Sequence, residues 1–504
     1  MPNSVLQAGV SGRRYNRYNL PIINEDWSRG MVKDAPLDAL PESAVYDATD
    51  FLLHQPARMM KRGGTSYAGP VMGSATYAAA VAFAEFPAAA QIIGVGDDGH
   101  LYKITAGTTT DVNTMGTAYV PLQNPVMRIG ATSYLIIPAN DGTSAPKKYD
   151  GTTVTAIGGS APAGKYVTVY KSRLVLGNNS ANPNRLFFSP TPDITTTWDT
   201  TNSWIDCDYA ITGLASLSNA IIVFSQGHTE RITGATPPPG SDMDRAPIGS
   251  VGCSDARSIS VWNNNVVFAN PRGVYLTNGS GFSSLTQIGG IETYWQTQLT
   301  GYDASTWTIA TGIYRNYLYI TVLNGSTLVD TLMCNIAARA WWRLTNVKAR
   351  GYANASTGSE ELYYADRASA RVITCSGMFT PVAGNKNDAN GTAVTPGATL
   401  RQVGAGPWMK HFGNARISYD MADAATDNPT LAVSVAPGLE AATFTAVSES
   451  PLAETSGLLR KRFTVGKQSQ AVNIKILQTN ASSKTEVYAM ETDQRYMGVY
   501  AGGQ

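Results

Sequence analysis

The chain has 504 residues, of which 43% are hydrophobic and only 15% are charged, and its formal net charge is +1. This length exceeds what one hydrophobic core usually organises, so we expect two or three domains. A net charge near zero excludes an overall electrostatic attraction to nucleic acid or to membranes, although a local basic lining can be hidden in the sum. Gly, Ser, Thr, Asn and Tyr are abundant, which is typical of a turn-rich all-β protein with surfaces buried in an assembly.

The cysteines and the apolar runs restrict the function classes further. The four cysteines lie far apart, each in or beside an apolar run and without a CxxC spacing: Cys207, Cys253, Cys334 and Cys375. This pattern predicts four buried free thiols and no zinc site. The N-terminus has no apolar leader, and no run approaches about 18 apolar residues. We therefore expect a protein that is made in the cytoplasm and has no membrane anchor.

Residues 1–75 are expected to form an extended N-terminal arm and connector. The first twenty residues are polar, and Pro36 and Pro41 interrupt the stretch that follows. Ser43 to Leu53 fits either one short helix or an extended connector, and no strand pattern is clear. A segment of this length without regular elements usually wraps around a neighbour or orders on a partner.

Residues 76–380 are expected to form a β-propeller. The clearest unit is Ser258–Phe282, which contains three short strands separated by turns at Asn263–Asn265 and Asn270–Gly273 and closed by Asn278–Gly279. Asn tolerates positive φ, and an Asn-Gly pair is the strongest short hairpin signal. Such a meander has one apolar side and is not stable alone in water, so it needs further copies to pack against.

The same strand and turn order recurs along the chain, with little residue identity between units. Aligning the second strand of each unit gives seven apolar anchor positions: Ile93, Leu135, Leu174, Ile222, Val266, Leu318 and Leu362. Their spacing is roughly 40 to 50 residues, which is the period of a four-stranded propeller blade. About six or seven blades fit. The alternative, an irregular set of β-sandwiches, does not account for a shared period.

Residues 381–504 are expected to form an antiparallel β-sandwich. A polar loop at Thr380–Leu400 marks the change in composition. Beyond this loop, alternating patterns predict six strands: Ala415–Tyr419, Thr430–Val435, Ala442–Val447, Arg460–Val465, Ala471–Leu477 and Lys484–Glu491.

No motif in the sequence indicates catalysis. There is no G-x-S-x-G elbow, no Walker A motif and no Rossmann loop, and the histidines at 54, 100, 228 and 411 lie too far apart for an HxxxH zinc pair. The acidic pairs Asp97–Asp98, Glu360–Glu361 and Asp242/Asp244 fall in or beside turns, where we expect solvated carboxylates. We therefore predict a protein that is not an enzyme and has no metal ion or cofactor.

Basic clusters are the remaining signal. They are candidate contacts to DNA phosphates or to a neighbouring subunit, because Arg and Lys release counterions and the interleaved Tyr15 and Tyr18 can stack. The alternative is ordinary solvated charge or a protein–protein salt bridge. The candidates are Arg13, Arg14, Arg17, Arg58, Lys61, Arg62, Arg460, Lys461 and Arg462.

The N-terminal region resembles tail proteins of short-tailed phages that carry a GG…LP…N…KRPG pattern. Gly30-Met31, Leu40-Pro41 and Lys61-Arg62-Gly63 fill three of these places. Arg29 replaces the first Gly of the pattern, and Gly63 stands where Pro is common. The segments Ser218–Gly234 and Gly249–Gly279 also resemble the propeller core of these tail hub or nozzle proteins, the tail tubular protein B group. The likeness extends to about Gly377.

This resemblance implies a structural virion protein. Members of the group form a hexameric ring below the portal and adaptor, lengthen the tail tube, hold fibres or spikes, and let double-stranded DNA pass without reading its sequence. Two alternatives stay open. One is a propeller that binds or depolymerises host surface glycans, with Trp307 and Trp341-Trp342 as candidate aromatic platforms unless these pack within blades. The other is a soluble protein-interaction propeller, which predicts a monomer.

Overall fold

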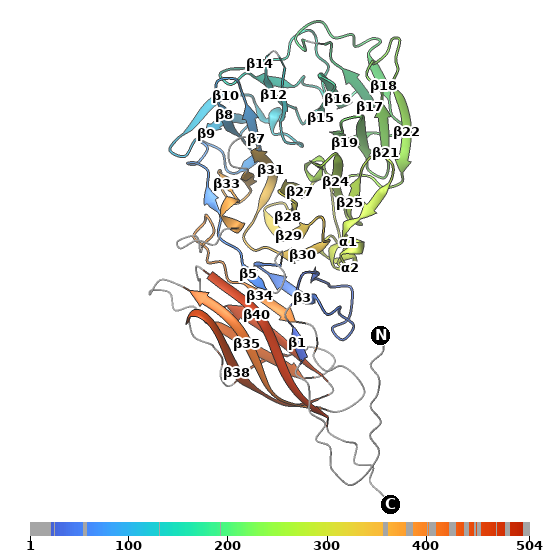
Figure 1. The fold of residues 1–504 in the computed structure, drawn as a ribbon. Coiled ribbons are helices and arrows are strands. Elements are labelled where there is room, and N and C mark those ends of the chain that lie inside the picture. The colour runs from blue at the N-terminus through green and yellow to red at the C-terminus, as the bar shows by residue number, and fades with distance from the viewer. Residues whose placement is uncertain are drawn as a thin grey trace, which may run out of the picture.

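The computed structural model describes most of the chain. The described residues are 22–24, 26–53, 58–130, 132–191, 193–355, 361–379, 387–400, 402, 410–422, 430–437, 443–447, 450, 455–469, 471–478 and 484–496. In this part of the chain, a β-propeller lies above a β-sandwich (Figure 1). The predicted all-β class, with a propeller followed by a C-terminal sandwich, is confirmed.

Within the described residues, the propeller has seven blades of four antiparallel strands each. The blades follow one another around the ring in chain order, and Figure 1 shows the propeller nearly along its central axis. Blades 1 to 4 contain β7 (Ala78–Glu85), β8 (Ala90–Gly96), β9 (His100–Ile104) and β10 (Thr109–Thr114); β11 (Val126–Arg128), β12 (Tyr134–Ile137), β13 (Lys147–Tyr149) and β14 (Val154–Ala156); β15 (Tyr166–Tyr170), β16 (Arg173–Asn179), β17 (Asn182–Phe188) and β18 (Trp204–Asp206); and β19 (Ile211–Ser216), β20 (Ala220–Ser225), β21 (Thr229–Thr233) and β22 (Asp244–Gly249).

Blades 5 to 7 complete the ring. They contain β23 (Ser260–Trp262), β24 (Asn265–Asn270), β25 (Gly273–Thr277) and β26 (Phe282–Ser284); β27 (Trp307–Tyr314), β28 (Tyr317–Asn324), β29 (Thr327–Asn335) and β30 (Ala340–Arg343); and β31 (Ala349–Ala355), β32 (Glu361–Asp366), β33 (Val372–Thr374) and β6 (Ser66–Tyr67). Two short helices, α1 (Leu285–Ile288) and α2 (Glu292–Gln298), connect blades 5 and 6. Three 3-10 turns are η1 (Thr117–Tyr119), η2 (Ala256–Ser258) and η3 (Ser376–Phe379).

The predicted repeat is confirmed position by position. All seven predicted anchor residues lie in the second strand of a blade and are completely buried. Apolar clusters fill the spaces between neighbouring blades, so each sheet buries both faces. The turn at Asn263 and Asn264 has the positive φ values of 46° and 57° that the sequence predicts.

The propeller is closed by the N-terminal segment. The first strands of the blades contact one another around the ring, and β31 of blade 7 contacts β7 of blade 1. The fourth strand of blade 7 is β6, where Tyr67 pairs with Ile373 and Ser66 pairs with Thr374. The chain before residue 75 is therefore not simply an arm, because one of its strands completes the last blade.

The sandwich consists of two sheets that both recruit N-terminal strands. One sheet has the order β38-β35-β40-β5-β4, with β1 also paired to β40. The other runs β3-β34-β39-β36-β37 and continues through β2 into blade 6. The strands are β1 (Ile22–Asn24), β2 (Gly30–Met31), β3 (Ala44–Thr49), β4 (Phe51–Leu52), β5 (Met59–Lys61), β34 (Gly397–Leu400), β35 (Lys410–Ala422), β36 (Leu431–Pro437), β37 (Thr445–Ala446), β38 (Thr455–Ser469), β39 (Val472–Gln478) and β40 (Lys484–Tyr496).

Five of the six predicted sandwich strands are confirmed, and the sixth, Ala442–Val447, is a strand only at Thr445–Ala446, with Ala442 outside the described residues. The prediction missed the strands that join the two domains. Ser43–Leu53 is neither a helix nor a connector, since it forms β3 and β4. The polar loop predicted at Thr380–Leu400 ends in β34, which pairs with β3. These strands are only two to six residues long. Such short strands show no period in the sequence, because they are defined by the sheets to which they add.

A shared core links the propeller to the sandwich. One apolar cluster includes Trp295 and Trp341 from the blade 5 to 6 region together with Ile417 and Ile474 from the sandwich. The predicted buried thiols are confirmed, since all four cysteines are free and buried. None of the described helices is long and apolar enough to cross a membrane.

Candidate functional site

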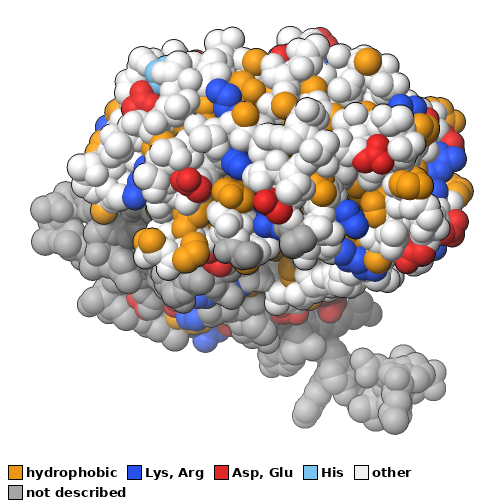
Figure 2. Space-filling model, turned by 90° about the horizontal axis from the view of Figure 1, so that it is seen from above, with side chains coloured by type: hydrophobic (Ala, Val, Ile, Leu, Met, Phe, Trp, Pro, Cys, Tyr) orange, Lys and Arg blue, Asp and Glu red, His pale blue; other side chains and the backbone are white. Residues whose placement is uncertain are grey.

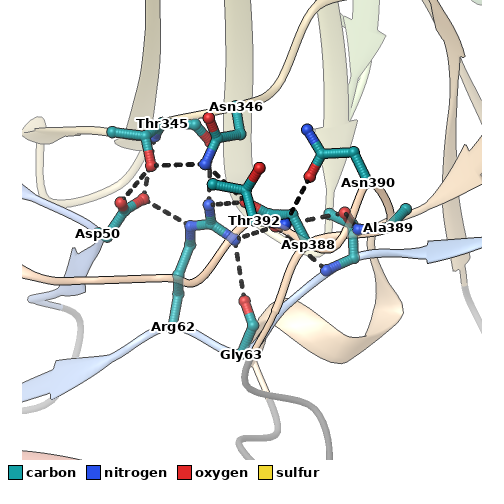
Figure 3. A network of polar contacts seen from close by, with 10 residues as sticks. Asp50, Arg62, Gly63, Thr345, Asn346, Asp388, Ala389, Asn390 and Thr392 are labelled. Carbon is teal, nitrogen blue, oxygen red and sulfur yellow. Dashed lines mark hydrogen bonds and ion pairs between the residues drawn. The ribbon is translucent and has the colours of Figure 1, made fainter. Parts of the chain in front are cut away.

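A buried and fully bonded charged group, Arg62, follows β5 at the junction of the two domains (Figure 3). Its Nε donates to Asp50 Oδ1 at 2.6 Å, and Nη1 and Nη2 donate to the two oxygens of Asp388, both at 2.8 Å. The remaining N–H groups donate to the carbonyls of Gly63 and Thr345 at 3.0 and 2.9 Å. All five donors of the guanidinium therefore have a partner.

Both carboxylates of this cluster are bonded in turn. Asp50 accepts hydrogen bonds from the backbone N–H of Thr345 at 3.0 Å and from its hydroxyl at 2.5 Å. Asp388 accepts from the backbone and hydroxyl of Thr65 at 3.3 Å. Burial opposes the charge of Arg62, but the two carboxylates outweigh burial and raise the pKa of the guanidinium. We call Asp50, Arg62, Thr345 and Asp388 the domain clamp.

The domain clamp ties together three parts of the chain. Asp50 and Arg62 belong to the N-terminal strands, Thr345 lies between blades 6 and 7, and Asp388 lies in the segment that leads from the propeller to β34. Removing one partner from such a buried group leaves an uncompensated charge, which is strongly destabilising. The arrangement is suited to fastening the domains together, not to binding a ligand.

This placement corrects two of the sequence predictions. Arg62 is completely buried and Lys61 is only 1% exposed, so neither side chain reaches DNA or a neighbouring subunit from this position. The sequence suggested a phosphate or subunit contact because Lys61 and Arg62 follow Arg58 in a basic cluster. The two carboxylates that pair with Arg62 are distant in sequence. Asp50 lies 12 residues before Arg62, and Asp388 lies 326 residues after it.

The other described basic candidates lie in or next to the sandwich sheet that contains β38, β40 and β5. Arg58 forms an ion pair with Glu486 at 2.9 Å, and Arg460 contacts Glu491, which also pairs with Arg416. Arg460, Lys461 and Arg462 are exposed in the middle of β38, where successive side chains point to opposite faces. Arg13, Arg14 and Arg17 lie outside the described residues.

Among the described residues, the face of the propeller rim seen in Figure 2 shows no basic patch, because its acidic and basic side chains are interspersed.

The prediction of aromatic platforms is also corrected. Trp341 and Trp342 are completely buried and Trp307 is 8% exposed, so they pack within blade 6 and are not available to a sugar. Asp97 and Asp242 accept hydrogen bonds from backbone N–H groups of their own turns or neighbouring loops, as expected for turn carboxylates.

A pocket at blade 4 lies where the sequence predicted no site. It has a volume of about 590 Å³ and is lined by Tyr209, Ser225, Gln226, His228 and Ser250, among others. Tyr209 is 57% exposed and meets the His228 ring edge-on, with 5.4 Å between the ring centroids. We call this the blade 4 pocket.

Two carboxylates, Asp208 and Glu230, lie beside His228, which lines the blade 4 pocket. Ligand atoms of Asp208, His228 and Glu230 all lie within 4.8 Å of one another, which is close enough for one metal ion. However, Arg245 Nη1 contacts Asp208 at 2.7 Å and Glu230 at 3.3 Å. A cation would have to displace this guanidinium. His228 and Glu230 are two residues apart, and this spacing places side chains on the same face of a strand. This spacing was the available signal for the cluster in the sequence.

A second pocket lies on the propeller axis, at the end where the first strands of the blades begin. It has a volume of about 270 Å³, and its lining includes Leu122, Tyr166, Thr212, Asp255, Arg257 and Tyr302, from the starts of successive blades. We call it the axial pocket. Asp255 caps η2 and accepts from Arg257 Nε at 2.9 Å and from Nη2 at 3.0 Å. Asp255 also accepts from the backbone N–H of Ile309 in blade 6 at 3.0 Å.

Comparisons with known proteins leave the function open. No protein-family profile matches the chain, and no curated protein sequence matches it. Among solved structures, the chain is similar to BBS1N in complex with ARL6DN, in crystals soaked with mercury or with lead. The mercury structure has 12% identity and a TM-score of 0.41, covering 62% of this chain and 97% of that one. The lead structure has 11% identity and a TM-score of 0.40, covering 62% and 96%.

Proposed function

We propose that this chain is a structural subunit of the tail of a short-tailed phage, of the hub or nozzle kind. Six copies would form a closed ring below the portal and adaptor, made in the host cytoplasm and incorporated in the virion. The ring would extend the DNA channel and hold fibres or spikes. The proposal starts from the sequence resemblance at Gly30-Met31, Leu40-Pro41 and Lys61-Arg62-Gly63.

The observation that carries the proposal is what these motif residues do in the fold. Gly30 has a φ of 73°, and a Cβ there would lie 2.7 Å from both the backbone N and O of Trp341. Only glycine fits this close approach of β2 to blade 6. Met31 is completely buried in the shared core, and Arg62 is the centre of the domain clamp. These motif residues therefore join the propeller to the sandwich.

The joint makes the two domains one mechanical unit. They share a continuous sheet, one apolar cluster and a buried ionic network. An ordinary interface between domains resembles a transient protein–protein contact and allows relative motion unless it is large and hydrophobic. A ring that supports fibres and encloses DNA requires subunits whose parts do not swing, which is what this joint supplies.

The proposal is tested by the mass of the purified protein, measured by light scattering, alone and after mixing with the portal–adaptor complex of the same virion. We expect a ring of six subunits in solution or on the portal complex, visible by electron microscopy. A stable monomer that never joins the tail parts would overturn the proposal.

Assembly can also be related to the basic residues of β38. The triple change Arg460→Gln, Lys461→Gln and Arg462→Gln tests whether their exposed side chains contact a neighbour, with Arg185→Gln in blade 3 as the control. We expect the triple variant to weaken ring formation or portal binding more than the control does. Equal effects from both would remove these residues from the interface.

A second candidate function has one observation in its favour. In the blade 4 pocket, exposed Tyr209 contacts the ring of His228, and Asp208 and Glu230 lie beside His228. An aromatic face with nearby carboxylates is a common way to hold a sugar. A propeller acting on host glycans would bind or cleave oligosaccharides in a screen, and Glu230→Gln would abolish cleavage. A screen without binding or cleavage would eliminate this candidate.

A further inference from the structure

The axial pocket contains a buried guanidinium that is only partly bonded. Arg257 is 7% exposed, and it uses Nε and Nη2 for the side-on pair with Asp255. Its Nη1 is buried and has no hydrogen-bond partner, although it carries two N–H groups. A buried donor without an acceptor is unfavourable, because it has lost its hydrogen bonds to water without replacing them. Arg257 lines the pocket, and the two N–H groups of its Nη1 have no acceptor among the described residues.

Other donors at the same end of the propeller are also unused. The hydroxyl of Tyr302 is buried without a partner, and Tyr302 lines the same pocket. Burial, followed by the charge of Asp255, raises the pKa values of Tyr302 and Tyr166. Both phenols therefore keep their protons at neutral pH and can act as donors. The lining of the pocket thus includes one guanidinium and two phenols, and the Tyr302 hydroxyl has no partner.

The charges around the pocket do not balance. Arg350, on the first strand of blade 7, lies close enough that the charge of Arg257, after burial itself, lowers its pKa to about 10. Arg350 Nε is another buried donor without a partner. Asp255 is the carboxylate paired with Arg257, and Asp303 next to Tyr302 is exposed and caps its own turn. Two arginines thus share one buried carboxylate.

We propose that the axial pocket binds a small oxyanion, either a phosphate or a carboxylate, through Arg257, Tyr302 and Tyr166. An oxyanion supplies the acceptors that these donors lack and the negative charge that the arginine pair lacks. Water could satisfy the hydrogen bonds but would leave the charge uncompensated. At about 30 Å³ for one water, the pocket has room for about nine, which accommodates an anion of this size with part of its hydration. Because the lining comes from successive blades, the anion would tie the starts of their first strands together.

The test is titration of the full-length protein with phosphate, acetate or chloride at constant pH and ionic strength, following the thermal midpoint and the heat of binding. We expect a saturable increase in the midpoint with phosphate or with acetate, and none with chloride. A response to phosphate alone identifies a phosphate-type ligand, whereas a response to acetate alone identifies a carboxylate. If neither anion differs from chloride, the proposal is wrong.

Substitutions locate the binding. Arg257→Met should weaken the anion affinity by about tenfold to hundredfold, because a hydrogen bond to a charged group is lost together with the charge. Arg185→Met is the matched control, since Arg185 also pairs side-on with a single carboxylate, Asp206, through Nε and Nη2 but is more exposed. The control should bind as the original protein does. Unchanged binding by Arg257→Met would place the anion elsewhere and overturn the proposal.

A gentler variant covers the case in which Arg257→Met does not fold. Tyr302→Phe removes one unpartnered hydroxyl and leaves the Asp255–Arg257 pair intact. We expect this variant to fold normally and to bind the anion about tenfold more weakly. Full affinity in Tyr302→Phe, together with a failure of Arg257→Met to fold, would contradict the assigned donors.

Discussion

The domain clamp and the axial pocket are each built around a buried arginine, and they differ in how completely that arginine is bonded. In the clamp, all five donors of Arg62 have partners and two carboxylates face one guanidinium. In the axial pocket, Arg257 has one carboxylate, and its Nη1 has no partner. Both arginines are more than nine-tenths buried.

The difference separates a structural site from a candidate binding site. A fully bonded buried charge rigidifies its surroundings and has nothing left to offer a ligand. A partly bonded one is unfavourable as it stands and is relieved when an acceptor arrives. Burial and a high guanidinium pKa occur in both places, so neither property alone indicates function. What distinguishes the candidate binding site is the number of guanidinium N–H groups without a partner.

The largest effect is expected from breaking the clamp. Arg62→Met should lower the free energy of unfolding by about 3–5 kcal/mol, because Asp50 and Asp388 stay buried without their counter-ion. Urea unfolding followed by tryptophan fluorescence measures the change. The exposed pair gives the control, since Arg185→Met should change stability by less than about 1 kcal/mol. A loss of the same small size in Arg62→Met would show that the clamp does not hold the domains together.

The same variant should open the clamp locally, and two buried thiols report on this. Cys375 lies near Arg62 and Asp388, and Cys253 bonds within η2 beside the axial pocket. Burial raises the pKa of both thiols, that of Cys253 to about 12. Neither should react with an alkylating reagent at pH 8 in the native protein.

In Arg62→Met, we expect alkylation of Cys375 to accelerate by about hundredfold or more, in line with the lost stability, while Cys253 stays slow. Mass spectrometry of the labelled peptides distinguishes the two sites. Equal acceleration of both thiols would mean that the propeller and the sandwich unfold as one cooperative unit and that the clamp has no local opening of its own.

The strands of this protein differ in how well the sequence could predict them. The blades and the sandwich strands were predictable because strands of several residues leave an alternating pattern and their turns carry Asn and Gly. The N-terminal strands were not, because β2 and β4 contain only two residues each. Nothing in such a segment distinguishes a strand from a connector until the neighbouring sheets are known.

The chemistry of the arginines was less predictable than the fold. Lys61 and Arg62 looked like exposed basic residues in the sequence, because Asp388, the main partner of Arg62, is 326 residues away. Asp255 and Arg257 are only two residues apart, so their pairing had a local signal. The unused donor of Arg257 had none, because it depends on which side chains blades 3, 6 and 7 place around the axis.

Thr345→Val should have an intermediate effect on the clamp. It removes the hydroxyl that donates to Asp50 and keeps the backbone N–H bond and nearly the same side-chain volume. Losing a hydrogen bond to a buried charged group should lower the free energy of unfolding by about 1.5–3 kcal/mol. Urea unfolding measures this, and Thr345→Ser, which keeps the hydroxyl, should recover most of the loss. If the serine variant is no better than the valine, packing and not the hydrogen bond explains the effect.

The smallest effect is expected from the matching change in the axial pocket. Tyr302→Phe in anion-free buffer removes a buried hydroxyl that has no partner, so no protein hydrogen bond is lost. We expect stability to stay the same or to rise by up to about 1 kcal/mol, because an unsatisfied buried polar group is itself unfavourable. Thermal unfolding in chloride measures the change. A loss as large as that of Thr345→Val would mean that the Tyr302 hydroxyl is satisfied in solution, and the contrast between the two arginine sites would then disappear.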